Sequence, residues 1–167
     1  MRIPSLLFAA LALALAGCAS APVEPGRTFD GWYLDRSEGD EPQALWTLLT
    51  GEPAQAGTRV HLRQRDGYAP EAFLYRDGIC QQKETLDDAA WQEDELHLQT
   101  SSFDGIPPLA WGRIRRELKL QPEGEALRVD LHESRFGMFL IMIGGAPDRN
   151  VVYRFAGVAA DIRQDCR

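Results

Sequence analysis

Alternation of apolar and polar residues with a period of two is the feature that most constrains the fold of this chain. Residues 58–64, 95–99 and 127–131 each place aliphatic side chains on every second position, with charged or polar residues between them. Successive side chains of a β-strand point to opposite faces of a sheet, so this pattern predicts strands with one buried face. We therefore expect antiparallel sheet to dominate the molecule.

Turn sequences separate several of these strands. Residues 121–124 (Gln-Pro-Glu-Gly) lie between the apolar positions of 111–120 and those of 127–131, which predicts a hairpin. Asp77-Gly78 follows the short apolar run 72–75 and is typical of a tight hairpin turn.

The last third of the chain is less regular. Residues 136–143 are apolar at nearly every position, which favours a strand buried on both faces. A turn is expected at 147–150 (Pro-Asp-Arg-Asn), followed by a strand at 151–155. The tail 156–166 fits a strand or a short helix.

Helix signals are few. Asp40-Glu41-Pro42 resembles a helix start, leucines follow at helical spacing, and Gly51 is a stop signal. A short turn of helix is also expected at 87–94, around Trp91. With about eight short strands, the expected fold class is all-β or β-rich α+β: a single antiparallel barrel or sandwich with one or two short helices.

The predicted core contains the apolar residues that share a parity along their strands. They are Val60, Leu62, Leu96, Leu98, Ile114, Leu118, Leu127, Val129, Leu131, Phe139 and Ile141.

The N-terminal sequence indicates a processing signal. Arg2 supplies a positive charge, residues 6–15 are only Leu, Phe and Ala, and Ala16-Gly17 precede Cys18. This order resembles the bacterial lipoprotein signal peptide, and an apolar run of about ten residues is too short to remain as a membrane-spanning helix. The resemblance implies cleavage before Cys18 and diacylation of that cysteine, which would anchor the protein to a membrane.

The resemblance, together with composition and length, predicts the organisation and location of the chain. Residues 1–17 are the expected cleaved signal, 18–27 a lipidated flexible tether, and 28–167 a single β-rich domain. Ala19 and Ser20 follow the cysteine, with no Asp as an inner-membrane retention signal, so the expected location is the outer membrane, facing the periplasm.

Two cysteines, Cys80 and Cys166, remain if Cys18 carries lipid. An oxidising compartment favours a disulfide between them, and two free buried thiols are the alternative. Neither cysteine has the CxxC spacing or the nearby histidine of a typical metal site.

Charge and motifs exclude several functions. The formal net charge of −7 disfavours nucleic-acid binding, which depends on neutralising phosphates. GxSxG, HExxH and glycine-rich phosphate loops are absent from the sequence, so we expect no catalytic residues and no cofactor. The three histidines, His61, His97 and His132, lie on polar positions of separate strands, and we interpret them as solvated side chains and not as a metal site.

Basic residues share one face on each of two predicted strands. They are Arg59, His61, Arg63 and Arg65 on the first strand, and Arg113 and Arg115 on the second. Arginine binds carboxylates and phosphates through paired hydrogen bonds, so this basic face is the predicted binding surface for an anionic ligand or a protein partner. The alternative is a solvated sheet face on which acids such as Glu117 and Asp130 pair with the arginines.

Three functions fit these observations. The first is a noncatalytic, membrane-anchored periplasmic lipoprotein whose β-domain binds a ligand or protein partner. The second is an inhibitor or immunity-type lipoprotein against a basic cell-wall hydrolase; this chain is similar to such proteins in being small, acidic, disulfide-bonded and β-rich. The third is a hydrolase without a recognisable motif.

Overall fold

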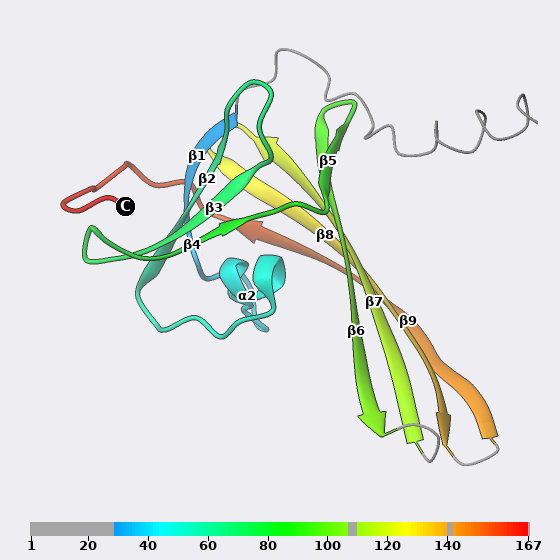
Figure 1. Ribbon diagram of the computed structural model, residues 1–167. Coiled ribbons are helices and arrows are strands. Elements are labelled where there is room, and N and C mark those ends of the chain that lie inside the picture. Colours follow the sequence, from blue (N-terminus) through cyan, green and yellow to red (C-terminus); the bar gives the residue numbers. More distant parts are fainter. Residues whose placement is uncertain (1–28, 107–109, 140–141, 167) are drawn as a thin grey trace, which may run out of the picture.

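The computed structural model describes residues 29–106, 110–139 and 142–166. These residues form nine β-strands and one short helix. The strands make two antiparallel sheets, one with the order β1-β2-β3-β4 and the other with the order β5-β6-β7-β8-β9 (Figure 1). The predicted β-rich fold is confirmed. Within the described residues it is a sandwich of two open sheets and not a closed barrel.

The four-stranded sheet consists of β1 (Phe29–Leu34), β2 (Thr58–Gln64), β3 (Glu71–Arg76) and β4 (Ile79–Thr85). The five-stranded sheet consists of β5 (Ala89–Gln92), β6 (Glu95–Ile106), β7 (Ala110–Glu123), β8 (Ala126–Phe139) and β9 (Met142–Phe155). The helix α2 (Leu45–Thr50) connects β1 to β2.

The alternating residues fill the space between the sheets. Eight predicted core residues are buried, namely Val60, Leu62, Leu96, Leu98, Leu118, Leu127, Val129 and Leu131. Ile114 is only half-buried, because it lies beyond the part of β7 that the four-stranded sheet covers. The Phe139 side chain and Ile141 lie outside the description.

The helix α2 contributes Leu45, Trp46 and Leu49 to the core. It is shorter than predicted and begins at Leu45, because its first turn is held by a distant residue. Asp35, just after β1, accepts hydrogen bonds from the Trp46 backbone N–H and the Thr58 hydroxyl, both at 2.7 Å. Gly51 ends the helix with φ of 79°, a left-handed conformation that glycine adopts without strain, as the stop signal predicted.

The predicted turn of helix at 87–94 is wrong. Residues 89–92 form β5, which pairs with β6 through a tight turn in which Glu93 has φ of 57°. Trp91 packs against Phe29 with ring centroids 6.0 Å apart and donates its indole N–H to Gln64. These contacts to the opposite sheet require an extended backbone at Trp91.

The predicted strand at 136–143 and turn at 147–150 are also wrong. Residues 136–139 end β8, and β9 begins at Met142 and continues through the expected turn to Phe155. Two β9 residues, Pro147 and Asp148, lie opposite one β8 residue, because Glu133 pairs with Arg149 and Arg135 with Ala146. The turn residues therefore form a bulge in an edge strand, where proline costs no ladder hydrogen bond.

Four strands continue past the core and form a projecting arm. The last buried row across the sheet is Leu98, Leu118, Leu131 and the half-buried Val151. We call the described residues beyond this row the arm: 99–106, 110–117, 132–139 and 142–150. In Figure 1 the arm extends away from the four-stranded sheet and α2.

Candidate binding surfaces

The first group of predicted binding residues lies on the face of the four-stranded sheet that points away from the core. There His61 pairs with Trp32 on β1 and Phe73 on β3. Its ring stacks between them, with centroids 4.4 Å from Trp32 and 5.4 Å from Phe73. His61 Nε2 lies 2.8 Å from Asp30 Oδ1, and only 8% of the side chain is exposed. The interpretation of His61 as a solvated residue is therefore wrong.

Arginines on this face have acidic partners. Arg63 donates to Glu71 Oε2 at 2.9 and 3.2 Å, and its guanidinium lies 4.6 Å from the centre of the Phe73 ring. Lys83 Nζ lies 2.6 Å from the other Glu71 oxygen. The hydrogen bond from Lys83, joined by those from Arg63, lowers the pKa of Glu71 in spite of its partial burial. Arg59 lies 3.8 Å from Asp161, and Arg65 is exposed just after β2.

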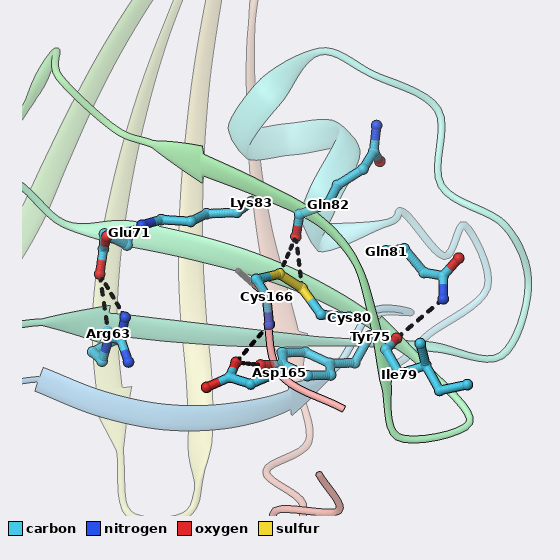
Figure 2. Close-up of a disulfide and its surroundings, with 10 residues drawn as sticks. All are labelled: Arg63, Glu71, Tyr75, Ile79, Cys80, Gln81, Gln82, Lys83, Asp165 and Cys166. Carbon is cyan, nitrogen blue, oxygen red and sulfur yellow. Dashed lines mark hydrogen bonds and ion pairs between the residues drawn. A yellow bond between two sulfur atoms is a disulfide. The ribbon is translucent and has the colours of Figure 1, made fainter. Parts of the chain in front are cut away.

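Residues 156–166, which we call the strap, cover part of this face. A disulfide between Cys80 and Cys166, whose Cα atoms are 5.2 Å apart, joins the strap to β4 (Figure 2). Beside it, the buried Tyr75 donates its hydroxyl to Asp165 at 2.6 Å. Burial and this hydrogen bond raise the pKa of Tyr75. The predicted disulfide is confirmed, and it holds a second layer over the aromatic residues.

The second group of predicted residues, Arg113 and Arg115, lies on the arm. Both side chains are exposed, and neither forms an ion pair with a carboxylate whose position is described. Arg113 is in register between Phe103 on β6 and Phe136 on β8. The structure thus places the six predicted residues on two different sheets and does not bring them together.

Aromatic side chains surround Arg113. Phe103 is 62% exposed and Phe136 is 53% exposed. Trp111 links them, with ring centroids 5.4 Å from Phe103 and 6.2 Å from Phe136. Ile143, one row further along the arm, is 69% exposed. Large apolar side chains gathered on an exposed face are typical of an interaction surface.

The opposite face of the arm begins with a buried carboxylate. Glu133, with 5% of its side chain exposed, accepts hydrogen bonds from Arg116 at 2.7 Å and from Arg135 at 2.8 Å. Burial raises the pKa of Glu133, but the bonds from the two arginines outweigh it and the pKa is lowered. These arginines are therefore used to satisfy a buried acid, unlike Arg113 and Arg115.

A shallow hollow lies on the arm beyond this ion pair. Its volume is about 570 Å³. Glycines from three strands, Gly112, Gly137 and Gly144, form one row across its floor, and Ile114 and Arg135 also line it. The arm therefore offers both exposed rings and open backbone to a partner.

The four arm residues Phe103, Trp111, Phe136 and Ile143 were missed by the sequence reasoning. The sequence does carry a sign of an uncharged surface in this region: residues 105–112 and 136–147 contain no charged side chain. Residues 136–143 were interpreted as a buried strand, although Phe136 and Ile143 are exposed in the structure.

The other histidines lie in the five-stranded sheet. His97 Nε2 is 3.4 Å from Glu95, and His132 Nδ1 is 2.7 Å from the Asn150 side-chain oxygen. Among the described residues, no three His, Cys, Asp or Glu side chains gather closely enough to hold a metal ion.

Comparison with known proteins gives no family for this chain: no protein-family model, curated protein or solved structure matches it. In the described ranges, no helix has the length and apolar character needed to cross a membrane.

Proposed function

We propose that this protein is a lipoprotein of the outer membrane, anchored through Cys18 and facing the periplasm, whose β-domain is a noncatalytic binding module. The signal sequence and Cys18 lie outside the described residues, and the proposal for them rests on the sequence alone. The proposal for the domain rests on the arm.

The observation that supports binding is the exposed apolar and arginine-bearing face of the arm. Phe103, Phe136 and Ile143 are more than half exposed, and the adjacent Arg113 and Arg115 have no described acidic partner. Apolar rings beside guanidinium groups that have no described ion pair fit a partner surface that combines apolar and anionic groups. The matching surface of the four-stranded sheet is instead partly covered by the strap, and Glu71 pairs with its Arg63.

The charge of the arm gives less support to an inhibitor of a basic hydrolase. Such an inhibitor needs carboxylates at its contact surface, because opposite charges guide the two proteins together. The arm carries five arginines against four acids, although the whole chain has a net charge of −7. The arm is thus weakly basic within an acidic protein, and two of its arginines, Arg116 and Arg135, already pair with Glu133.

Lipidation is tested by labelling cells with a fatty-acid analogue. The wild type should be labelled and Cys18→Ser should not, because Cys18 is the only cysteine outside the Cys80–Cys166 pair. Equal labelling of both proteins would contradict the anchor.

Binding by the arm is tested by photo-crosslinking in cells. A benzophenone amino acid replaces Phe136 on the arm or, as a matched control, Tyr68, an exposed aromatic residue between β2 and β3 that is 69% exposed. We expect an adduct of defined mass from position 136 only, and its loss when Arg113→Gln and Arg115→Gln are added. The same adduct from position 68, or one that persists without the arginines, would refute the arm as the binding element.

A further inference from the structure

Edge strands of a sheet carry unpaired N–H and C=O groups that a further strand can bind, and proteins usually cover or blunt them. The strap covers both edges of the four-stranded sheet. Gly157 forms a bridge with Tyr33 on β1, and Gln164 forms a bridge with Ile79 on β4. Neither edge is therefore open along its whole length.

In the five-stranded sheet, the β9 edge of the arm is blunted. The bulge at Pro147 and Asp148 interrupts the ladder, and the next residue is charged Arg149. Proline, charge and a bulge are the features that prevent a further strand from adding to an edge.

In its described residues the β6 edge of the arm has neither a bulge nor a proline, and its one charged residue is Asp104. The short β5 pairs with β6 only as far as Leu98, so residues 99–106 have β7 on one side and no described strand on the other. Their pairing with β7 runs to Ile106 without a shift of register. Residues 99–103 (Gln-Thr-Ser-Ser-Phe) contain no proline, glycine or charge.

We propose that residues 100–106 of β6 pair with the same residues of a second copy of this chain. The two strands run antiparallel about a twofold axis at Phe103, which joins the two arms into one continuous sheet. A twofold contact of this kind uses the same surface on both copies and closes after two. This dimer goes beyond the binding proposed above: it uses the edge of the arm and the Phe103 ring, and it leaves Phe136, Ile143 and Arg113 on the face for the partner.

Pairing about this twofold axis covers the exposed Phe103 ring. Directly opposite residues of an antiparallel pair have Cβ atoms about 5 Å apart on the same face. The two Phe103 rings then lie side by side, and each already stacks on its own Trp111. A ring that is 62% exposed in the single chain loses much of its contact with water.

Charges oppose the pairing only weakly. In this register Asp104 lies opposite Ser102 of the other copy, so the two Asp104 positions are diagonal neighbours about 7–8 Å apart, close to the screening length. Each Arg113 is one strand further in, on β7. Three strand spacings then separate the two Arg113 residues, about 14 Å, which exceeds the screening length of about 8 Å at physiological ionic strength.

Sedimentation equilibrium of the full chain tests the dimer. All proteins carry Cys18→Ser, so that neither lipid nor a disulfide at this position joins the copies. Two variants change the proposed edge, Ser101→Lys and Phe103→Ser, and Ala146→Lys introduces the same charge on the β9 edge. All three positions are exposed, and near-ultraviolet circular dichroism checks that each variant is folded.

We expect the parent protein and Ala146→Lys to form dimers with the same dissociation constant. Each β6 variant should dissociate at least about tenfold more readily, because a charge or a lost ring at the axis is counted twice in the dimer. A monomeric parent would overturn the proposal. So would association that the β6 variants do not weaken, since another surface, such as the apolar N-terminal segment, would then be responsible.

Discussion

The outer face of the four-stranded sheet and the face of the arm carry the same kinds of residue, but they differ in what surrounds them. On the sheet, Arg63 lies over Phe73 and against Glu71, and the strap covers the neighbouring Tyr75. On the arm, Arg113 lies in register between two exposed phenylalanines. The comparison teaches that arginine beside aromatic rings contributes to the fold where acids and a second layer are present. Where they are absent, the same residues are available to a partner.

The largest effect on stability should come from releasing the strap from the four-stranded sheet. Replacing Cys80 and Cys166 by serine should lower the free energy of unfolding by about 2–4 kcal/mol, because the disulfide closes a long loop. Release of the strap should also bring the pKa of Tyr75 down toward 10.0, its usual value, which an alkaline absorbance titration measures. An unchanged titration would show that the strap stays in place without the disulfide, and Cys18→Ser serves as the control.

A smaller loss of stability is expected when Glu133, the buried acid of the arm, is replaced. Glu133→Gln should cost about 1–2 kcal/mol in urea unfolding, since two charge-assisted hydrogen bonds are weakened but both arginines remain partly exposed.

The Glu133 effect should depend on pH. Its pKa is lower in the folded protein than the ordinary 4.5, so its contribution is complete above about pH 4.5 and disappears as the pH falls through the folded value. The variant should lack this part of the acid destabilisation. A wild type and a variant that lose stability in parallel below pH 4.5 would contradict this role.

Arg63→Gln sharpens the comparison on the covered face. The loss of the bonds to Glu71 and of the contact with the Phe73 ring should lower stability by about 1 kcal/mol. Thermal unfolding of Arg63→Gln and Glu71→Gln, singly and together, measures the coupling between them. Effects that simply add would show that the pair is not an energetic unit.

The smallest effect on stability is expected for Arg113→Gln with Arg115→Gln. Exposed residues without described ion pairs change stability by less than about 0.5 kcal/mol on substitution. The same variant should lose the crosslink from position 136. A clear loss of stability in urea unfolding would place these arginines with Arg63 as residues that serve the fold.

The sequence predicts the strands best where one face is buried. Residues 58–64 were expected as a strand and form β2 with the same bounds, because Val60 and Leu62 face the core. Polar alternation assigned His61 correctly to the other face. It gave no indication that this face has a cover, because the covering residues are about a hundred positions further along the chain.

The arm was harder to predict for a related reason. The parity of Arg113 and Arg115 is correct, since both point to the exposed face. Phe136 and Ile143 were expected to be buried because they belong to an apolar run. Hydrophobicity predicts burial only where another layer packs against the sheet, and on the arm both residues are exposed. Pro147 and Asp148 looked like a turn because turn residues and edge-strand bulges use the same amino acids.

The path of the chain has a consequence for the order in which the protein matures. The strap follows directly after β9, so the segment that covers the edges of the four-stranded sheet is synthesised after all of the described strands. Until residues 156–166 arrive, β1 and β4 present open edges, and Cys80 lacks the cysteine with which it pairs. The Cys80–Cys166 bond can therefore form only after the described strands have been made, and a chain arrested before Ala156 should leave Cys80 without Cys166 and the β1 and β4 edges exposed to aggregation.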